Sequence, residues 1–132
     1  MNPLAAPAFL ALALAASCAP PEPVQELSLA AIEPGVRVIG EGQTCINRSL
    51  IRNTDVRNDR VIDFEMRGGE VYRNVLPGDC PGLDLEDAFT YDTEINQLCS
   101  SEIIYVLRNF GGRLQRGAGC GLGQFVPVEY ED

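Results

Sequence analysis

The side chains of this chain that could carry out acid–base or nucleophilic chemistry are limited to carboxylates, tyrosines and cysteines. The 132 residues contain no histidine, no lysine and no tryptophan, and all ten basic residues are arginine. Arginine stays protonated in proteins and cannot act as a general base. These absences exclude histidine-based triads, Schiff-base chemistry, lysine-dependent phosphate loops and histidine-ligated metals. Proton transfer would have to come from Asp, Glu, Tyr or Cys.

The carboxylate pair best suited to such chemistry is Asp63 and Glu65, which alternate with Ile62, Phe64 and Met66. Alternate residues of a strand share one face, so the two acids would lie side by side. Two carboxylates that flank a glycosidic bond can hydrolyse it. Sugar sites also use aromatic platforms, and acids alternating with apolar residues are the ordinary pattern of a half-exposed strand. The sequence therefore favours an exposed pair without a catalytic role.

A second group of carboxylates lies between positions 79 and 94. Its members are Asp79, Asp84, Glu86, Asp87, Asp92 and Glu94. Oxygen ligands suit calcium, but the spacing matches no EF-hand loop. We therefore predict a solvated acidic loop, with no metal and no other cofactor.

Glycines alternate around one cysteine near the C-terminus, at Gly117, Gly119, Gly121 and Gly123. A glycine-rich phosphate cradle would need a strand before it, a helix after it and usually a lysine. The lysine and the helix are both missing. The pattern instead predicts that the backbone passes close to a disulfide or a bulge there.

Four aromatic residues could line the rim of a binding pocket, because amphipathic rings often do so. They are Tyr72, Phe89, Tyr91 and Tyr105. Each lies in or beside a predicted strand or helix, so the sequence favours packing against the core.

The first 17 residues are typical of an export signal, because positions 4–17 are uncharged and too short to span a bilayer. The junction Ala15-Ala16-Ser17-Cys18 resembles a bacterial lipobox, in which the cysteine receives lipid. Leucine is commoner at position 15, and no positive charge precedes the apolar run, so the signal is atypical or the true start lies upstream. We expect lipidation at Cys18; the alternative is ordinary cleavage near Ala19.

The remaining cysteines are even in number and suit an oxidising compartment. They are Cys45, Cys80, Cys99 and Cys120. No two are close enough in sequence for a zinc knuckle, and four cysteines allow three pairings. We expect disulfides Cys80–Cys99 and Cys45–Cys120, so that a short loop lies within a long one. A small domain with a thin hydrophobic core would need the stability that these two bonds add.

The net charge of −9 argues against a nucleic-acid partner and against attraction to an anionic membrane surface. Residues 18–36 are rich in proline and predict a stiff tether. Residues 37–132 then form one small domain.

Apolar residues in this domain recur with a period of two, which indicates strands. We expect strands over residues 44–51, 62–66, 71–76, 103–107 and 125–130, with 103–107 central. Residues 53–59 are predicted to form a polar turn, and residues 84–89 the one helical stretch. Tight turns are predicted at Gly68-Gly69 and Gly111-Gly112. Pro127 would mark an edge strand. The expected fold is a small, mainly antiparallel β sandwich or barrel stapled by disulfides, with at most one short helix.

Residues 44–130 resemble a family of small exported proteobacterial proteins that is catalogued only as a domain of unknown function. The order of the four cysteines with their neighbours carries the resemblance, in segments 80–83, 89–91, 98–99, 103–106 and 120–125. The chain departs from the family at residues 100–102, where a Gly-Asp pair often follows the third cysteine. The resemblance implies a location in a Gram-negative cell envelope and implies no activity.

The sequence thus favours an envelope lipoprotein, periplasmic or at the outer membrane. Its domain would be a non-catalytic module that binds another protein, a glycan or a small ligand. A hydrolase using carboxylates alone and a purely structural lipoprotein are the alternatives. A binding module predicts an exposed edge strand or apolar patch, whereas an enzyme predicts at least two acids that converge in a cleft and have a raised pKa.

Overall fold

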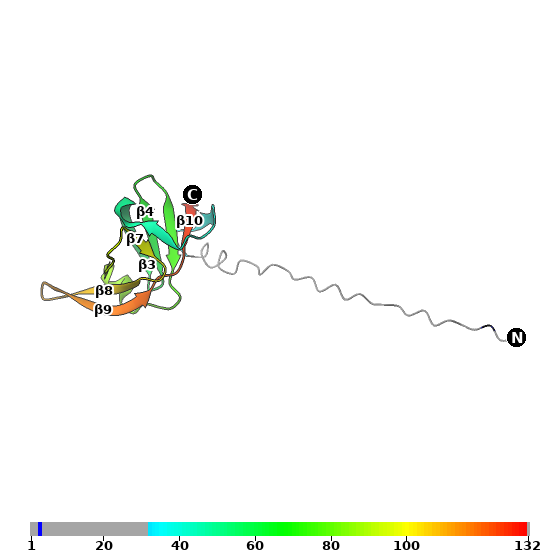
Figure 1. The fold of residues 1–132 in the computed structure, drawn as a ribbon. Helices are drawn as coiled ribbons and strands as arrows, with labels where there is room; N and C mark the ends of the chain where they lie inside the picture. The colour runs from blue at the N-terminus through cyan, green and yellow to red at the C-terminus, as the bar shows by residue number, and fades with distance from the viewer. Residues whose placement is uncertain (1–2, 4–31, 132) are drawn as a thin grey trace.

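The computed structural model describes residue 3 and residues 32–131 of the chain. The predicted signal, Cys18 and most of the predicted tether therefore lie outside the described residues. The described domain consists of antiparallel strands in sheets of five, three and two strands, with one short α-helix (Figure 1). The predicted mainly β class is confirmed, and the strands do not close into a barrel. Within the described residues, no helix combines the length and apolar character needed to cross a bilayer.

The chain passes several times between the three sheets, and consecutive strands share a sheet at β3–β5 and at β8–β9. In chain order they are β1 Val36–Val38, β2 Cys45–Asn47, the 3-10 helix η1 Arg48–Leu50, β3 Ile51–Asn58, β4 Val61–Met66, β5 Val71–Val75, α2 Leu83–Glu86, β6 Phe89–Tyr91, β7 Gln97–Cys99, β8 Ile103–Phe110, β9 Arg113–Gly121 and β10 Phe125–Tyr130. The five-stranded sheet has the order β1-β10-β5-β4-β3, the three-stranded sheet β6-β8-β9, and β2 pairs with β7.

The strands predicted from strong alternation are confirmed. The run at 62–66 is β4, and it turns through Gly68-Gly69 into β5. The apolar run at 103–107 begins β8, which is the central strand of its sheet. The turn at Gly111-Gly112 joins β8 to β9, and the short helix α2 lies at the start of the predicted helical stretch.

Two predictions for the region before β4 are wrong. Residues 53–59 were expected to form a polar turn, but β3 extends through Asn58. Its polar side chains are compatible with a strand because β3 is the edge of its sheet and none of its residues is fully buried. The strand expected over 44–51 is also shorter, since β2 ends at Asn47 and η1 follows. The Asn47 side chain ends that strand by accepting a hydrogen bond from the Ser49 N–H.

The prediction that Pro127 marks an edge strand is wrong as well, because β10 lies between β1 and β5. The Pro127 carbonyl accepts a hydrogen bond from Ile39, on the β1 side. The nitrogen and carbonyl of one strand residue face the same neighbour. The proline nitrogen therefore faces Ile39, just beyond the end of β1, so the missing N–H removes only the bond that would extend that pairing.

Apolar side chains pack on both faces of the five-stranded sheet. The main core holds Phe64 at its centre, with Phe89 and Phe125 in edge-to-face contact at 6.3 and 5.3 Å between ring centroids. Leu83 joins it from α2. A smaller valine cluster covers part of the opposite face. Burial on both faces explains why β4 is almost wholly buried, in contrast to the half-exposed strand predicted.

Two disulfides are present, but their pairing differs from the prediction. The bonds are Cys45–Cys99 and Cys80–Cys120, not Cys80–Cys99 and Cys45–Cys120. The first joins directly paired residues of β2 and β7, and the second joins the chain before α2 to β9. The separations along the chain could not reveal this pairing because it depends on which strands lie side by side.

Candidate functional site

The carboxylate pair singled out in the sequence does not face a substrate. Asp63 is buried, with a side chain 1% exposed. Its Oδ1 accepts a hydrogen bond from Arg73 Nε at 2.7 Å, and its Oδ2 accepts bonds from Arg73 Nη2 and Arg57 Nε, both at 2.9 Å. The Tyr130 hydroxyl donates a further bond to Oδ2 at 3.1 Å. The prediction that Asp63 is an exposed acid is therefore wrong.

The reason lies in the neighbouring strands, which bring two arginines to the face on which Asp63 lies. Arg73 is its direct cross-strand neighbour on β5, and Arg57 reaches it from the irregular end of β3. Glu65, the other member of the pair, forms an ion pair with Arg52. Both carboxylates are thus held by arginines, and Asp63 has no contact with solvent through which it could accept a substrate proton.

The network also shifts the pKa of Arg57 and the pKa of Tyr130. Burial lowers the pKa of Arg57, but its hydrogen bonds to Asp63 and Tyr130 outweigh that effect and leave the pKa raised. Burial raises the pKa of Tyr130, and its hydrogen bond to Asp63 acts in the same direction, against the opposing effect of Arg57. The network therefore favours a charged guanidinium and a neutral phenol.

The same network fixes the chain that enters the domain. Arg73 donates from Nη1 to the Ile32 carbonyl and from Nη2 to the Pro34 carbonyl, both at 2.9 Å. Packed structure therefore begins N-terminal to position 37, because these carbonyls and β1 are already part of the domain. These contacts give the Asp63–Arg73 pair a structural role.

The acidic stretch from 79 to 94 does not gather into a metal site. Within residues 32–131, no group of three or more carboxylates, cysteines or histidines is arranged to hold a metal ion. Asp79 and Asp84 line an open hollow of about 920 Å³ together with Asp59. Asp59 Oδ1 accepts a hydrogen bond from the Asp84 N–H, and Arg60 donates to the carbonyls of Leu76 and Pro77 in the wall.

Three of the four glycines around Cys120, at positions 117, 119 and 123, lie where a Cβ atom would press against a neighbour, whereas Gly121 lies in open space. A Cβ atom on Gly123 would lie 2.2 Å from the Val75 carbonyl oxygen. Asn74 fixes this approach, since its side chain both accepts from the Gly123 N–H and donates to the Gly123 carbonyl. The ladder between β8 and β9 also has an irregularity beside Gly117.

Three of the four aromatic candidates pack against the core, as the sequence favoured. They are Tyr72, Phe89 and Tyr91. Burial raises the pKa of Tyr91. Tyr105 lies instead on the outer face of the three-stranded sheet, with the Arg116 guanidinium 4.9 Å from its ring centroid.

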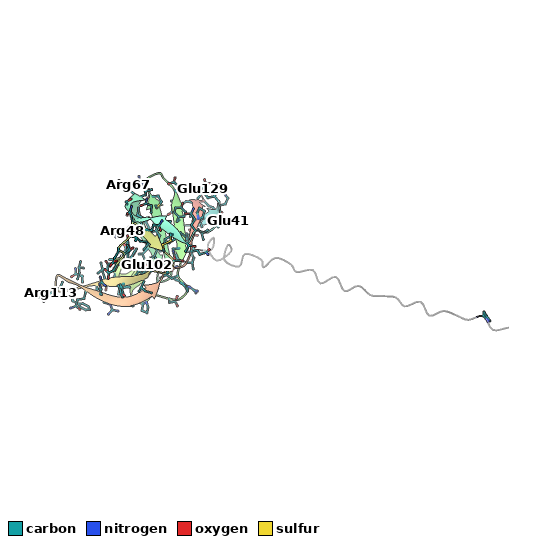
Figure 2. The ribbon with its side chains drawn as sticks, in the orientation of Figure 1. Glu41, Arg48, Arg67, Glu102, Arg113 and Glu129 are labelled. Atoms are coloured by element: carbon teal, nitrogen blue, oxygen red, sulfur yellow. A yellow bond between two sulfur atoms is a disulfide. The ribbon has the colours of Figure 1, made fainter. Side chains whose placement is uncertain are left out.

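The feature that sequence reasoning did not single out is the shape of the β8–β9 hairpin. The two strands extend from the body as a two-stranded ribbon (Figure 1). Strand β6 pairs with β8 only from Ile104 to Val106, and Leu107 adds one hydrogen bond to Ala88. Figure 2 shows Arg113 at the far end of this ribbon, well away from Arg67.

Apolar side chains are exposed on both faces of the ribbon. Phe110 is 56% exposed and Leu114 is 67% exposed. Phe110 pairs across the strands with Arg113, while Leu114 pairs with Asn109. We call Phe110, Arg113, Leu114 and Arg116 the hairpin surface.

The charge of this region is opposite to that of the rest of the molecule. Residues 103–128 contain no acidic residue and three arginines, whereas the rest of the chain holds seven arginines and all nineteen acids. The sequence already showed this segment without acidic residues. Its significance depended on knowing that residues 107–116 form an exposed ribbon.

At the base of the ribbon, Arg116 is oriented by two neighbours. It donates two hydrogen bonds to Asp92, at 2.8 and 2.9 Å, and lies over the Tyr105 ring. Hydrogen bonds from Arg116 lower the pKa of Asp92, and the same bonds raise the pKa of Arg116. Gly119 makes room for this arrangement, since a Cβ there would lie 3.0 Å from the Tyr105 ring.

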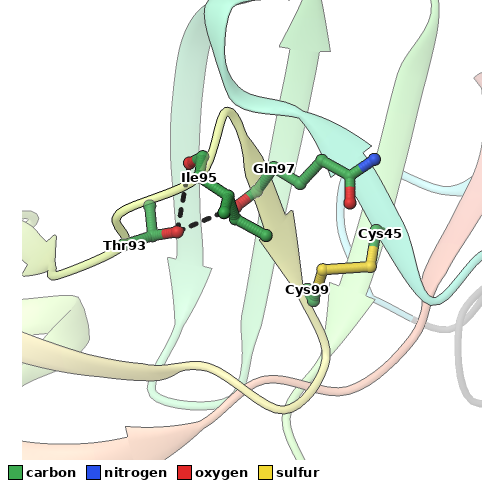
Figure 3. Close-up of a disulfide and its surroundings, with 5 residues drawn as sticks. All are labelled: Cys45, Thr93, Ile95, Gln97 and Cys99. Atoms are coloured by element: carbon green, nitrogen blue, oxygen red, sulfur yellow. Dashed lines mark hydrogen bonds between the residues drawn. A yellow bond between two sulfur atoms is a disulfide. The ribbon is translucent and has the colours of Figure 1, made fainter.

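The two disulfides hold different parts of this architecture. Cys80–Cys120 attaches β9 to the chain that leads into α2, so the base of the ribbon is fixed to the core. Cys45–Cys99 joins the two-stranded sheet, beside a loop in which the Thr93 hydroxyl lies 3.2 Å from the carbonyls of Ile95 and Gln97 (Figure 3).

Comparisons of the chain with protein-family models, with curated proteins and with solved structures find no match. The resemblance to the small exported proteobacterial proteins therefore stays a prediction.

Proposed function

We propose that this chain is an exported envelope protein, anchored by lipid at Cys18, whose domain is a non-catalytic module that binds another protein through the hairpin surface. The observation that carries the proposal is the exposed ribbon with Phe110 and Leu114 on its faces and arginines beside them. Aromatic residues and arginines are enriched where proteins bind one another, and exposed apolar groups on a projecting element favour a partner.

The location rests on separate support. Two disulfides are suited to an oxidising compartment, since cytoplasmic thiols are kept reduced. The apolar segment at 4–17 and the lipobox-like junction at Cys18 favour export with a lipid anchor.

An intact-mass measurement on protein from membranes tests the anchor: we expect a lipid adduct on Cys18 and four thiols that can be labelled only after reduction. A soluble product without the adduct would contradict it.

A site-specific crosslink tests the binding role. A photoreactive residue in place of Leu114, in the full chain expressed in its own cells, should yield one discrete protein adduct. Leu85 supplies the matched control, because it is also a leucine, is 86% exposed and lies on α2, outside the residues of the hairpin surface. We expect no adduct from position 85 and loss of the adduct at 114 when Arg113→Glu is added. Equal adducts at both positions would show that the ribbon is not the binding element.

A further inference from the structure

We infer that the free edge of β9 accepts an extended, acidic segment of the partner as an added antiparallel or parallel strand. The inference rests on the proposed function and names the kind of partner that the hairpin surface takes. Strand addition uses backbone hydrogen bonds for affinity and side chains for selectivity.

The orientation of the peptide groups on this edge follows from one hydrogen bond. Leu107 donates its N–H to Ala88, on the β6 side of β8. In an antiparallel ladder, the residue opposite it then has its own peptide groups facing away from β8. That residue is Arg116, and alternation gives the same orientation to Leu114. Both residues therefore present a donor and an acceptor outward, while Arg113 and Gln115 bond to β8.

The edge is also long and lightly protected. Strand β9 has nine residues, and no described strand pairs with its outer side. The other long edge, β3, carries charges of both signs and two register irregularities, which are devices that block edge pairing. The β9 edge has one irregularity, and between it and the turn lie Arg113 to Arg116 with no acid among them.

The ribbon itself gains from a third strand. Beyond Leu107 it is a two-stranded hairpin without a neighbouring strand in the described domain. Such a hairpin is marginally stable in water, and three strands are far more stable. An added strand would also cover part of Leu114 and Phe110.

Charge selects the acidic segment over a second copy of the chain. The region offers Arg113 and Arg108 to the incoming strand, whereas Arg116 is already held by Asp92. Two copies paired through β9 would bring these arginines of both copies together while the two acidic bodies, each part of a chain of net charge −9, approach one another. An extended segment with alternating carboxylates would instead gain opposite-charge cross-strand pairs.

The test uses the mature protein, labelled with ¹⁵N and purified from the envelope, and a capped peptide of alternating Glu and Val. At saturating peptide, we expect amide hydrogen exchange at Leu114 and Arg116 to slow by about tenfold or more, because exchange then requires the added strand to leave. Exchange at Arg113 and Gln115 should change much less.

The Lys–Val version of the peptide should not bind, and neither should a Glu–Val version methylated on its backbone nitrogens. Arg113→Glu should weaken binding, while Arg67→Glu at the other hairpin should not.

Each other outcome overturns the inference in a distinguishable way. Shifts of the Phe110 and Leu114 side chains without alternating amide protection would mean docking on the faces, and the proposed function would stand. Protection of the same amides without peptide, together with a dimer in sedimentation, would make the occupant a second copy. Failure of the Glu–Val peptide to bind would overturn the inference even where the crosslink at position 114 succeeds.

Discussion

The molecule contains two hairpins that turn at a Gly-Gly pair, and they differ in almost everything else. In the β4–β5 hairpin, Gly69 has a φ of +93° and donates its N–H to the Met66 carbonyl within the turn, and the Arg67 N–H also ties the turn to the Leu50 carbonyl outside it. In the β8–β9 hairpin, both glycines have positive φ, at +56° and +85°, and the turn is held by Asn109 of its own strand. The first hairpin lies inside a five-stranded sheet and the second extends beyond its neighbours.

The difference teaches that a turn sequence specifies a local bend but not the surroundings of the strands that it joins. The β4–β5 strands carry the buried Asp63–Arg73 pair, so this hairpin supports the fold. The β8–β9 ribbon carries exposed Phe110 and Leu114, so it is available to a partner. The predictions below test this division between a supporting hairpin and a binding hairpin.

The largest effect is expected where the supporting hairpin loses its buried charge. Asp63→Asn should destabilise the domain by about 3–5 kcal/mol, because Arg73 remains buried without its carboxylate partner. The free energy of unfolding in urea measures the loss. Asp92→Asn is the control on the ribbon side: it removes an exposed partner of Arg116 and should leave the urea midpoint close to that of the wild type. Similar losses of unfolding free energy in the two variants would contradict the division between a supporting hairpin and a binding hairpin.

A smaller loss is expected where the connection between β9 and β10 approaches β5. Gly123→Ala places a methyl group against the Val75 carbonyl and should cost about 1–3 kcal/mol, because the backbone must shift to admit it. Gly121→Ala is a close control, since a Cβ at that position meets nothing within 4 Å. Thermal unfolding of both variants measures the difference. A Gly123→Ala protein as stable as the wild type would show that this close approach does not constrain the connection between β9 and β10.

The two turns should respond differently to the same substitution. Alanine at Gly69 or Gly112 costs about 1–2 kcal/mol locally, because a side chain disfavours positive φ. At Gly69 the cost should appear in the global unfolding free energy, since the turn belongs to the five-stranded sheet. At Gly112 it should appear as faster amide exchange near the ribbon tip, with the global value nearly unchanged. A global loss at Gly112 as large as that at Gly69 would mean that the ribbon unfolds with the body.

The smallest effect concerns alkaline pH. The pKa of Tyr130 is raised in the folded protein, so as the pH rises past the ordinary value the unfolded state loses that proton first. The Tyr130 contribution is therefore present at neutral pH and is lost as the pH rises through the folded pKa. Urea midpoints at about pH 9 and about pH 11 should fall less steeply in Tyr130→Phe than in the wild type. Tyr91, whose pKa is also raised, accounts for part of the remaining slope.

Sequence patterns predicted the strands whose burial differs clearly between faces or is high throughout. Strands β4, β8 and β10 were found in this way, and so were the Gly-Gly turns. Strand β3 was missed because an edge strand tolerates polar residues, so its composition resembles that of a turn.

The features that were mispredicted depend on neighbours distant in sequence. Asp63 alternates with apolar residues and so resembles an exposed acid, until Arg73 and Arg57 are placed beside it. The pairing of the cysteines likewise depends on β2 lying beside β7. The hairpin surface could have been suspected from its acid-free run, but its exposure follows from the shortness of β6, which the sequence did not indicate.

The connectivity of the disulfides has a consequence for how the protein is made. The two bonds interleave along the chain, because Cys80 lies between Cys45 and Cys99, and Cys99 lies between Cys80 and Cys120. A chain that enters an oxidising compartment with its N-terminus first presents Cys45 and Cys80 before their native partners arrive. An oxidant that joins cysteines in order of emergence therefore forms a non-native bond, which thiol–disulfide exchange must rearrange. Correct maturation of this small domain should depend on a disulfide isomerase as well as on an oxidase.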